Sequence, residues 1–270
     1  MHPLSPLPEG GVDLSVRLDE GALRLTLTRP DQLNALTGTM VRVLSEALEA
    51  AVGRDDVRCV VISGTGGSFS AGADVAPGTG GQPAHERFDV RALDAANRLV
   101  RAVTNLDKPV VAAVNGIAAG VGCSLALACD LVLAARSAQF LLAFTRIGLM
   151  PDGGSSWTVA ASIGRAKAMR MALLAEPLSA AEAYDAGLVS HLVDDEELDQ
   201  LVTRLVHRLA AGPPLAFAAT KKAVNAATLS GLHDALERER TAQTVLLRTE
   251  DAAEGMRAFG EKRRPDFRGR

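Results

Sequence analysis

A run of twenty-one residues without a charged side chain, 109–129, lies near the middle of the chain. It has the length of a membrane-spanning helix, but it begins with proline and contains an asparagine and three glycines. Its pattern divides into a valine-rich segment (110–114), a glycine-containing turn (115–121) and a short apolar helix (122–128). Because the apolar pattern breaks at the turn, the run predicts a buried strand–turn–helix unit of an α/β protein and no membrane span.

The rest of the 270 residues alternates strands and helices to about residue 195 and is helical beyond it. Leucine and valine alternate with polar residues through 14–27 and predict a hairpin that turns at 19–21. Thr37 is an expected N-cap for a helix that ends near residue 52. The other predicted elements are strands at 59–62, 131–134, 139–143 and 188–193, a helix ending near 106, two helices flanking Gly164, a short helix after Ser179, and helices at 195–210, 214–228 and 231–248.

This pattern divides the chain into three parts. We expect a flexible N-terminus (1–11), an α/β core (12–195) that includes a surface loop at 76–84, and a C-terminal helical section (196–270).

Composition and charge exclude several classes of protein. Hydrophobic residues make up 47% of the chain, which is enough for a sizeable core, and the net charge of −3 gives no basic field for nucleic acid. The three cysteines form no CxxC pair and the five histidines form no HxxxH pair, so we expect no disulfide framework and no metal site. The N-terminus lacks the basic and apolar regions of a signal peptide, so a cytoplasmic protein is expected.

Two loops of small residues follow buried strands, at 69–74 and 115–122. Small side chains let a ligand approach the backbone closely, and two converging N–H groups would form an oxyanion hole. Tight turn geometry alone explains the same composition equally well. Residues 122–126 are also close to the GxSxG nucleophile elbow, with Ser124 at its centre, although a small residue at a packed helix start accounts for this serine more simply.

Several motifs in a fixed order together resemble the crotonase, or enoyl-CoA hydratase/isomerase, family. The resemblance runs from about residue 12 to residue 269. The motifs are Arg29-Pro30 with Asn34-Ala35-Leu36, Phe69-Ser70-Ala71-Gly72-Ala73-Asp74, Lys108 to Gly116, Gly120-Val121-Gly122, Ala128-Cys129-Asp130, Ser137-Ala138-Gln139-Phe140, Gly148-Leu149-Met150-Pro151, Thr220-Lys221-Lys222-Ala223 and Phe259 to Arg263.

This resemblance implies a spiral of ββα units, with C-terminal helices that assemble a homotrimer or a dimer of trimers. It implies an acyl-CoA thioester as substrate, with no other cofactor, no metal, no nucleic acid and no membrane partner. The implied oxyanion donors are the backbone amides of Ala71 and Val121. The implied substrate-binding residues are Ala35, Phe69, Ala71, Gly72, Ala73, Asp74, Gly120, Val121, Phe144, Phe259 and Lys262.

The chain departs from the family where hydratases carry two glutamates. Those positions hold Ser124 and Phe144. Hydration needs one group to activate water and a second to handle the proton at carbon, and neither side chain can do this. Asp152 can compensate, because the surrounding residues resemble the epoxyphenylacetyl-CoA isomerase branch, in which this Asp faces the acyl group. An N-cap at a helix start is the other interpretation of Asp152.

A single carboxylate suits a proton shuttle between two carbons, so we expect an acyl-CoA isomerase with Asp152 as its acid–base residue. An enoyl-CoA hydratase and a non-catalytic acyl-CoA-binding subunit are the alternatives, and a hydrolase that uses Ser124 is a third. Asp130 is expected to bond backbone amides at a helix end. Lys221 and Lys222 are expected on a solvated helix face, unless they reach CoA phosphates.

Overall fold

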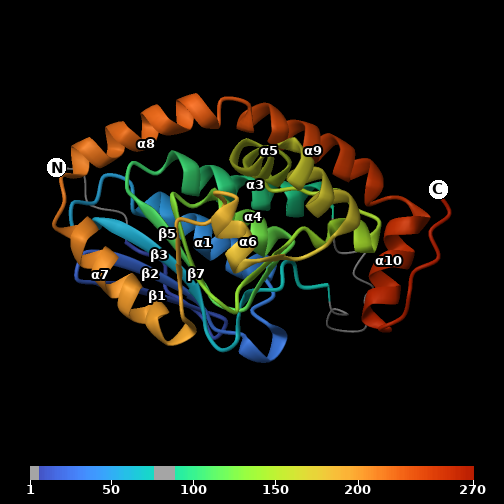
Figure 1. Cartoon of the computed structure of the whole chain (residues 1–270), viewed down its shortest axis with the longest axis horizontal. Helices are drawn as coiled ribbons and strands as arrows, with labels where there is room; N and C mark the ends of the chain where they lie inside the picture. Colours follow the sequence, from blue (N-terminus) through green and yellow to red (C-terminus); the bar gives the residue numbers. More distant parts are fainter. Residues whose placement is uncertain (1–5, 76–88) are drawn as a thin grey trace.

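The computed structural model describes residues 6–75 and 89–270. The molecule contains a six-stranded sheet, seen at the lower left of Figure 1, and its strand order is β1-β2-β3-β5-β7-β10. The hairpin of β1 (Leu14–Asp19) and β2 (Ala22–Leu27) is antiparallel, as its alternation predicts. The remaining strands join in parallel: β3 (Cys59–Gly64), β5 (Val110–Val114), β7 (Leu131–Ala135) and β10 (His191–Val193).

A second sheet of four short strands lies beyond the carboxyl ends of the first. Its order is β4 (Ser68–Ser70), β6 (Ile117–Ala119), β8 (Gln139–Leu141) and β9 (Leu178–Ser179). The prediction that 64–72 and 115–121 are loops throughout is therefore wrong, because each contains one three-residue strand. Such strands are too short to show a period, and only pairing with residues distant in sequence forms them.

The chain passes from one sheet to the other and then into a helix, three times in succession. The pairs β3–β4, β5–β6 and β7–β8 are followed by α3 (Val90–Asn105), α4 (Val121–Ala128) and α5 (Ser155–Leu174), the last after a 3₁₀ turn, η2 (Ala143–Ile147). This is the expected spiral of ββα units. The uncharged run 109–129 is thus β5, β6 and α4, and no helix in residues 6–75 and 89–270 is both long and apolar enough to cross a membrane.

Local signals explain where several helices begin and break. Thr37 caps α1 (Gly38–Ala50) by accepting a hydrogen bond from Met40 N at 3.2 Å. The predicted pair of helices around Gly164 forms one α5 element that is interrupted at this glycine, whose φ is 77°. Ser179 and Glu182 form a reciprocal capping box at the start of α6 (Ala180–Asp185).

The C-terminal section folds back over the core as four helices (Figure 1). They are α7 (Leu198–Ala210), α8 (Pro214–Thr228), α9 (Leu232–Leu246) and α10 (Glu250–Gly260). The first three match the predicted helices, whereas α10 was not predicted. Of the N-terminal segment 1–11, residues 1–5 lie outside the described part, as does the whole of the predicted loop 76–84.

The two faces of the large sheet pack against different helices because side chains alternate along each strand. Leu23, Leu25 and Leu27 belong to the main core, which includes the buried faces of α1, α3 and α4. Val61 and Leu133 point to the opposite face, where α7 contributes Leu201 and Val206. Both faces of the central strands are buried, as a parallel sheet requires.

Candidate active site

The first glycine-rich loop is held against residues 33–36 by a buried asparagine. Asn34 is fully buried with φ of 55°, and its Nδ2 donates to Ser68 O at 2.7 Å and Thr65 O at 2.8 Å. Ser70 Oγ donates back to Asn34 O at 2.9 Å. These contacts lock the chain around residues 68–72 to a neighbouring segment, so its backbone orientation is fixed.

In the described part of this loop, the backbone N–H that remains without an acceptor is that of Ala73, and not that of Ala71 as predicted. Ala71 N–H donates to Leu33 O at 2.8 Å, so the prediction of this amide as an oxyanion donor is wrong. Leu36 pairs with Ala73 by donating to Gly72 O at 2.7 Å and accepting from Asp74 N at 3.0 Å. In this bridge Ala73 N–H points away from Leu36. It has no acceptor among the residues that the structure describes.

The second loop meets the first at Gly120. A Cβ added to Gly72 would lie 2.8 Å from Ala119 O, and one added to Gly120 would lie 3.8 Å from Gly72 Cα. The two backbones therefore touch, and any side chain at residue 72 would force them apart. Val121 follows Gly120 as the first residue of α4, where an N–H has no intrahelical acceptor. No other acceptor for it lies in the described segments.

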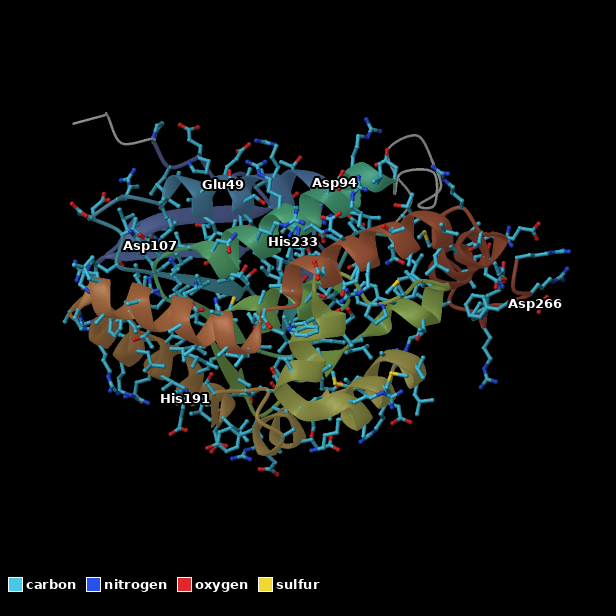
Figure 2. All side chains as sticks on the ribbon, turned by 90° about the horizontal axis from the view of Figure 1, so that it is seen from above. Glu49, Asp94, Asp107, His191, His233 and Asp266 are labelled. Carbon is cyan, nitrogen blue, oxygen red and sulfur yellow. The ribbon has the colours of Figure 1, made fainter. Side chains whose placement is uncertain are left out.

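Ser124 joins this second loop to the turn that carries Asp152. Its Oγ is buried and donates to Asp152 O at 2.7 Å, with a longer contact of 3.4 Å to Gly120 O. No histidine in the described part of the chain bonds to it, and His191 and His233 lie on different elements (Figure 2). Ser124 therefore holds two backbone segments together, and no base within the described residues bonds to it.

Asp152 carries the one strongly perturbed carboxyl near these loops. Gln243 Nε2 donates to its Oδ2 at 2.9 Å, while Oδ1 is buried with no hydrogen-bond partner within the described residues. The residue as a whole is only partly buried. Burial raises the pKa of Asp152 to about 7, the nearby charge of Glu239 adds to this, and the Gln243 bond opposes it.

The interpretation of Asp152 as the N-cap of α5 is wrong. Gly154 occupies the cap position, and the first amides of α5 bond to Glu239 of α9 instead. Glu239 Oε2 accepts from Gly154 N at 2.7 Å and its Oε1 accepts from Ser156 N at 3.0 Å. Only 1% of Glu239 is exposed, and this burial raises its pKa. Because the side chain of Asp152 caps no helix, its Oδ1 has no hydrogen-bond partner among the residues that the structure describes.

Sequence reasoning missed Glu239 and Gln243, although a signal for them exists. The buried residues of α9 recur at helical spacing, at 232, 235, 236, 239 and 243. Two polar residues at the end of an apolar stripe must find buried partners, because unpaired polar groups are costly inside a protein.

The remaining predicted residues divide between the loops, the core and the surface. Asp74 pairs with Arg29 Nη1 at 3.0 Å, Ala35 and Phe69 are buried beside the first loop, and Phe144 is buried in η2. Phe259 is 61% exposed and Lys262 lies just beyond α10, also exposed. Their predicted role over a neighbour's ligand stays a prediction.

Asp130 and Lys221 form a structural pair. Asp130 Oδ2 accepts from Val110 N at 2.7 Å, which confirms the expected bond to a backbone amide. Lys221 Nζ lies 2.8 Å from the same oxygen and also donates to Val103 O and Lys108 O. Its side chain is 8% exposed, so it is neither solvated nor free for a phosphate, and only Lys222 is exposed as predicted.

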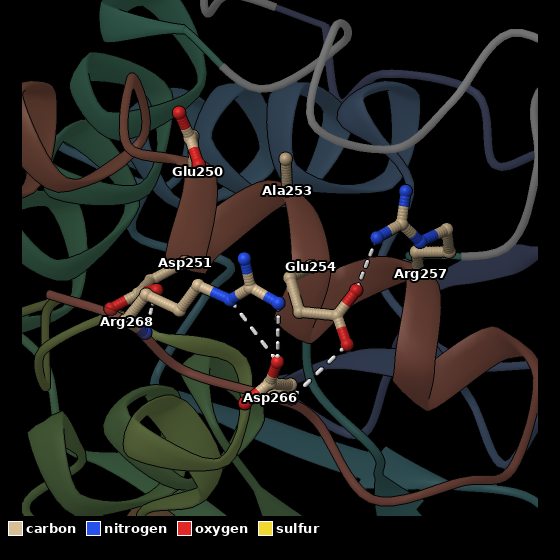
Figure 3. Close-up of a pocket in the computed structure, with 7 residues that line it drawn as sticks. All are labelled: Glu250, Asp251, Ala253, Glu254, Arg257, Asp266 and Arg268. Carbon is tan, nitrogen blue, oxygen red and sulfur yellow. Dashed lines mark hydrogen bonds and ion pairs between the residues drawn. The ribbon is translucent and has the colours of Figure 1, made fainter. Parts of the chain in front are cut away.

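A surface hollow is lined by residues of α10 and the C-terminal tail (Figure 3), and no residue of the two loops lines it. Its charged groups are already satisfied: Asp251 accepts from Arg268 N at 2.7 Å and Gly269 N at 2.8 Å, and Arg268 pairs with Asp266. These bonds hold the C-terminal tail against α10. Across the described residues, no cluster of three His, Cys, Asp or Glu side chains could bind a metal ion.

Comparisons with known proteins agree on one family. The sequence model of the enoyl-CoA hydratase/isomerase family matches residues 17–270. The chain is 40% identical to the 1,2-epoxyphenylacetyl-CoA isomerase of Escherichia coli over 94% of this chain and 97% of that protein. It is 42% identical to a probable enoyl-CoA hydratase of Rhodobacter capsulatus over 94% of this chain and 96% of that protein.

A crystal structure of an enoyl-CoA hydratase from Mycobacterium avium subsp. paratuberculosis is similar in fold as well as in sequence. The identity is 47% and the TM-score is 0.88, with 95% of this chain and 98% of that chain covered. The spiral of ββα units, the paired glycine loops and these relatives lead to one conclusion: the chain is an enzyme of the enoyl-CoA hydratase/isomerase, or crotonase, family.

Proposed function

We propose that the protein isomerises an unsaturated or strained acyl-CoA thioester through an enolate. The observation that carries this proposal is the position of Asp152, whose Oδ1 is buried without a described partner. Ser124 ties this residue to Gly120, and Gly120 touches Gly72. A carboxyl group and two loops, each of which contains an N–H without a described acceptor, therefore meet at one place.

The two N–H groups of Ala73 and Val121 suit the thioester oxygen. Negative charge develops on this oxygen when a proton leaves the adjacent carbon, and each preorganised donor is worth about 3 kcal/mol in the transition state. Ala73 replaces Ala71 in this role because its amide is the one without an acceptor in the described loop.

Asp152 then moves the proton. Its carboxylate takes a proton from one carbon of the acyl group, the electron pair passes into the enolate, and the resulting carboxylic acid returns the proton at another carbon. The pKa of about 7 suits both steps, since a shuttle must exist in both forms near neutral pH. No proton is gained or lost overall.

Hydration is less well supported, because it also requires a group that activates water. Ser124 Oγ donates its one hydrogen to Asp152 O, Phe144 is apolar, and both oxygens of Glu239 accept from the start of α5. One relative, at 40% identity, is named an isomerase and another, at 42% identity, is named a probable hydratase, so identity alone does not choose between the two reactions. The raised pKa of Asp152 favours a catalyst over a non-catalytic acyl-CoA binder, because carboxyl groups with strongly shifted pKa values cluster at functional sites.

The test is solvent-deuterium exchange into an unsaturated acyl-CoA, followed by mass spectrometry. We expect Asp152→Asn to lower the exchange rate roughly a hundred- to ten-thousand-fold with little change in CoA affinity. Ser124→Ala should change it far less. If Asp152→Asn exchanges as fast as the parent while Ser124→Ala is inactive, the isomerase is refuted and the serine hydrolase takes its place.

The same proposal includes a cytoplasmic homotrimer or dimer of trimers that needs no metal ion and no nicotinamide. CoA is part of the substrate and supplies most of the binding contacts. Acetyl-CoA should therefore bind in calorimetry where a free acid does not, and a chelator should leave the exchange rate unchanged.

A further inference from the structure

We infer that Gln243 of α9 is a positioning residue that turns the carboxyl of Asp152 so that Oδ1, and not Oδ2, exchanges the proton with the substrate. This inference rests on the proposed function, because it assigns a role toward the residue that the proposal makes the acid–base group. The inference goes beyond the proposed function because it assigns a role in the reaction to a residue of the C-terminal helical section.

Every hydrogen-bonding group of the Gln243 side-chain amide has a partner. Its Oε1 accepts from Met150 N at 3.1 Å, and its Nε2 donates to Met150 O at 2.9 Å and to Asp152 Oδ2 at 2.9 Å. Only 1% of the residue is exposed. Both amide hydrogens and the oxygen therefore have partners, and no water competes for them.

The contact with Met150 decides which way the amide points. A backbone N–H needs an acceptor and a backbone carbonyl needs a donor, so the reversed amide would lose both of these bonds. Nε2 must then face Asp152. A donor fixed against Oδ2 favours the unprotonated state of that oxygen, so a proton taken up by Asp152 goes to Oδ1. That is the oxygen without a described partner.

The residue types along α9 match the groups that they face. Glu239 faces two donors, Gly154 N and Ser156 N, which a carboxylate satisfies with both of its oxygens. Gln243 faces one donor and two acceptors, which a carboxylate could not satisfy. A glutamate at position 243 would also place a second negative charge against Asp152.

The surroundings leave Gln243 as the main polar control on the ionisation of Asp152. The charged neighbour that acts on it is Glu239, which disfavours the carboxylate. From α4 and α5, Ser124 and Ser155 contact only its backbone oxygen, and α3 contributes the apolar Val100 beside Gly153. Loss of the Gln243 donor should therefore raise the pKa of Asp152, since the bond favours the charged form.

The experiment compares Gln243→Met, which keeps the length and removes the bonds, with Asn97→Leu. Asn97 is also buried and its Nδ2 donates to α9, at Leu236 O, but it does not touch Asp152. We expect Gln243→Met to lower kcat roughly ten- to a hundredfold with KM changed less than about twofold. The acid limb of the pH–rate profile should move to higher pH, whereas Asn97→Leu should leave the limb in place.

A second variant keeps the inference falsifiable if Gln243→Met does not fold. Gln243→Glu preserves the shape and should move the acid limb upward further, because a like charge disfavours the carboxylate of Asp152. If the variants lower stability but leave kcat and the acid limb unchanged while Asp152→Asn is inactive, Gln243 is merely structural and the inference is overturned. If Asp152→Asn itself retains exchange, it is the proposed function that fails.

Discussion

One oxygen of Asp152 is buried without a hydrogen-bond partner among the described residues, and a group of this kind destabilises the fold when it is charged. The raised pKa, about 7 against an ordinary value of 3.8, expresses the same cost. The folded chain then binds a proton at a pH where the unfolded chain does not. Proton binding by Asp152 therefore stabilises the folded chain. This stabilisation is fully present below about pH 4 and is lost as the pH rises through 7.

We therefore predict that Asp152→Asn is more stable than the parent at pH 8, by of order 1–3 kcal/mol, and that the difference nearly disappears at pH 4.5. Asparagine stays uncharged at both values, and its oxygen can still accept from Gln243. Thermal unfolding at the two pH values measures the effect. A difference in Tm that is independent of pH would show that Asp152 is not held in a strained, ionised state.

At the level of the helix, α5 depends on α9 for its N-terminal cap. The two oxygens of Glu239 accept from the first amides of the helix, and its negative charge interacts favourably with the positive end of the helix dipole. In Glu239→Gln one acceptor becomes a donor facing an amide, so we expect a loss of about 1–3 kcal/mol in the free energy of unfolding. Denaturant unfolding is the measurement.

The control for this prediction is Glu237→Gln on the same helix. Glu237 is 51% exposed and pairs with Arg101 at 2.7 Å, and exposed pairs contribute about 0–1 kcal/mol. An equal loss in both variants would mean that charge alone, and not capping of α5, explains the effect.

The packing of α10 on η2 depends on a glycine in the middle of a helix. A Cβ at Gly255 would lie 2.5 Å from the carbonyl carbon of Ile147, which is closer than real contacts. Helix propensity alone favours alanine over glycine by about 1 kcal/mol. The backbone of Ile147, however, would have to move to make room for the Cβ, and such a shift destabilises the packing. We predict that Gly255→Ala loosens α10 and speeds its amide exchange. Gly260→Ala, where a Cβ meets nothing within 4 Å, should have no such effect.

Elements with a strong local pattern were predictable, and elements formed by distant contacts were not. Alternating leucines identify the first hairpin, and Thr37 marks the start of α1. By contrast, β4 forms by pairing with β6 across nearly fifty residues, and β6 also pairs with β8. The two loops were recognised from motifs, but which amide lacks a described acceptor depends on Leu33, and the capping of α5 depends on α9. A local pattern can show that a polar residue is buried, but it does not show which distant group that residue meets.

On the scale of the whole molecule, the spiral brings together segments that are far apart in the chain. The two amides that lack an acceptor in the described part of the chain follow Gly72 and Gly120, Asp152 precedes α5, and Gln243 lies on α9, so the proposed site draws on four regions. Because α9 supports the site from outside the α/β core, truncation of the C-terminal section would remove the contact that orients Asp152.

The surface carries large apolar side chains that a monomer would leave in water. In the second half of α5, Leu173 is 61% exposed and Leu174 is 63% exposed. None of the residues of α8 is buried, and its Leu215 is 85% exposed. Exposed apolar surface of this kind is typical of a contact between subunits. Closed symmetry then favours a discrete assembly over an open one.

We predict a sedimentation mass of three or six times the chain's 28.2 kDa. Leu173→Asp should lower this mass, because a desolvated charge in an apolar contact costs several kcal/mol and a trimer repeats the cost three times. Val52→Asp is the matched control: Val52 is also 60% exposed, but it lies just past the end of α1, away from α5 in the sequence. A parent that sediments as a monomer would contradict the predicted assembly. A Leu173→Asp variant that keeps the full mass would show that α5 lies outside the contact between subunits.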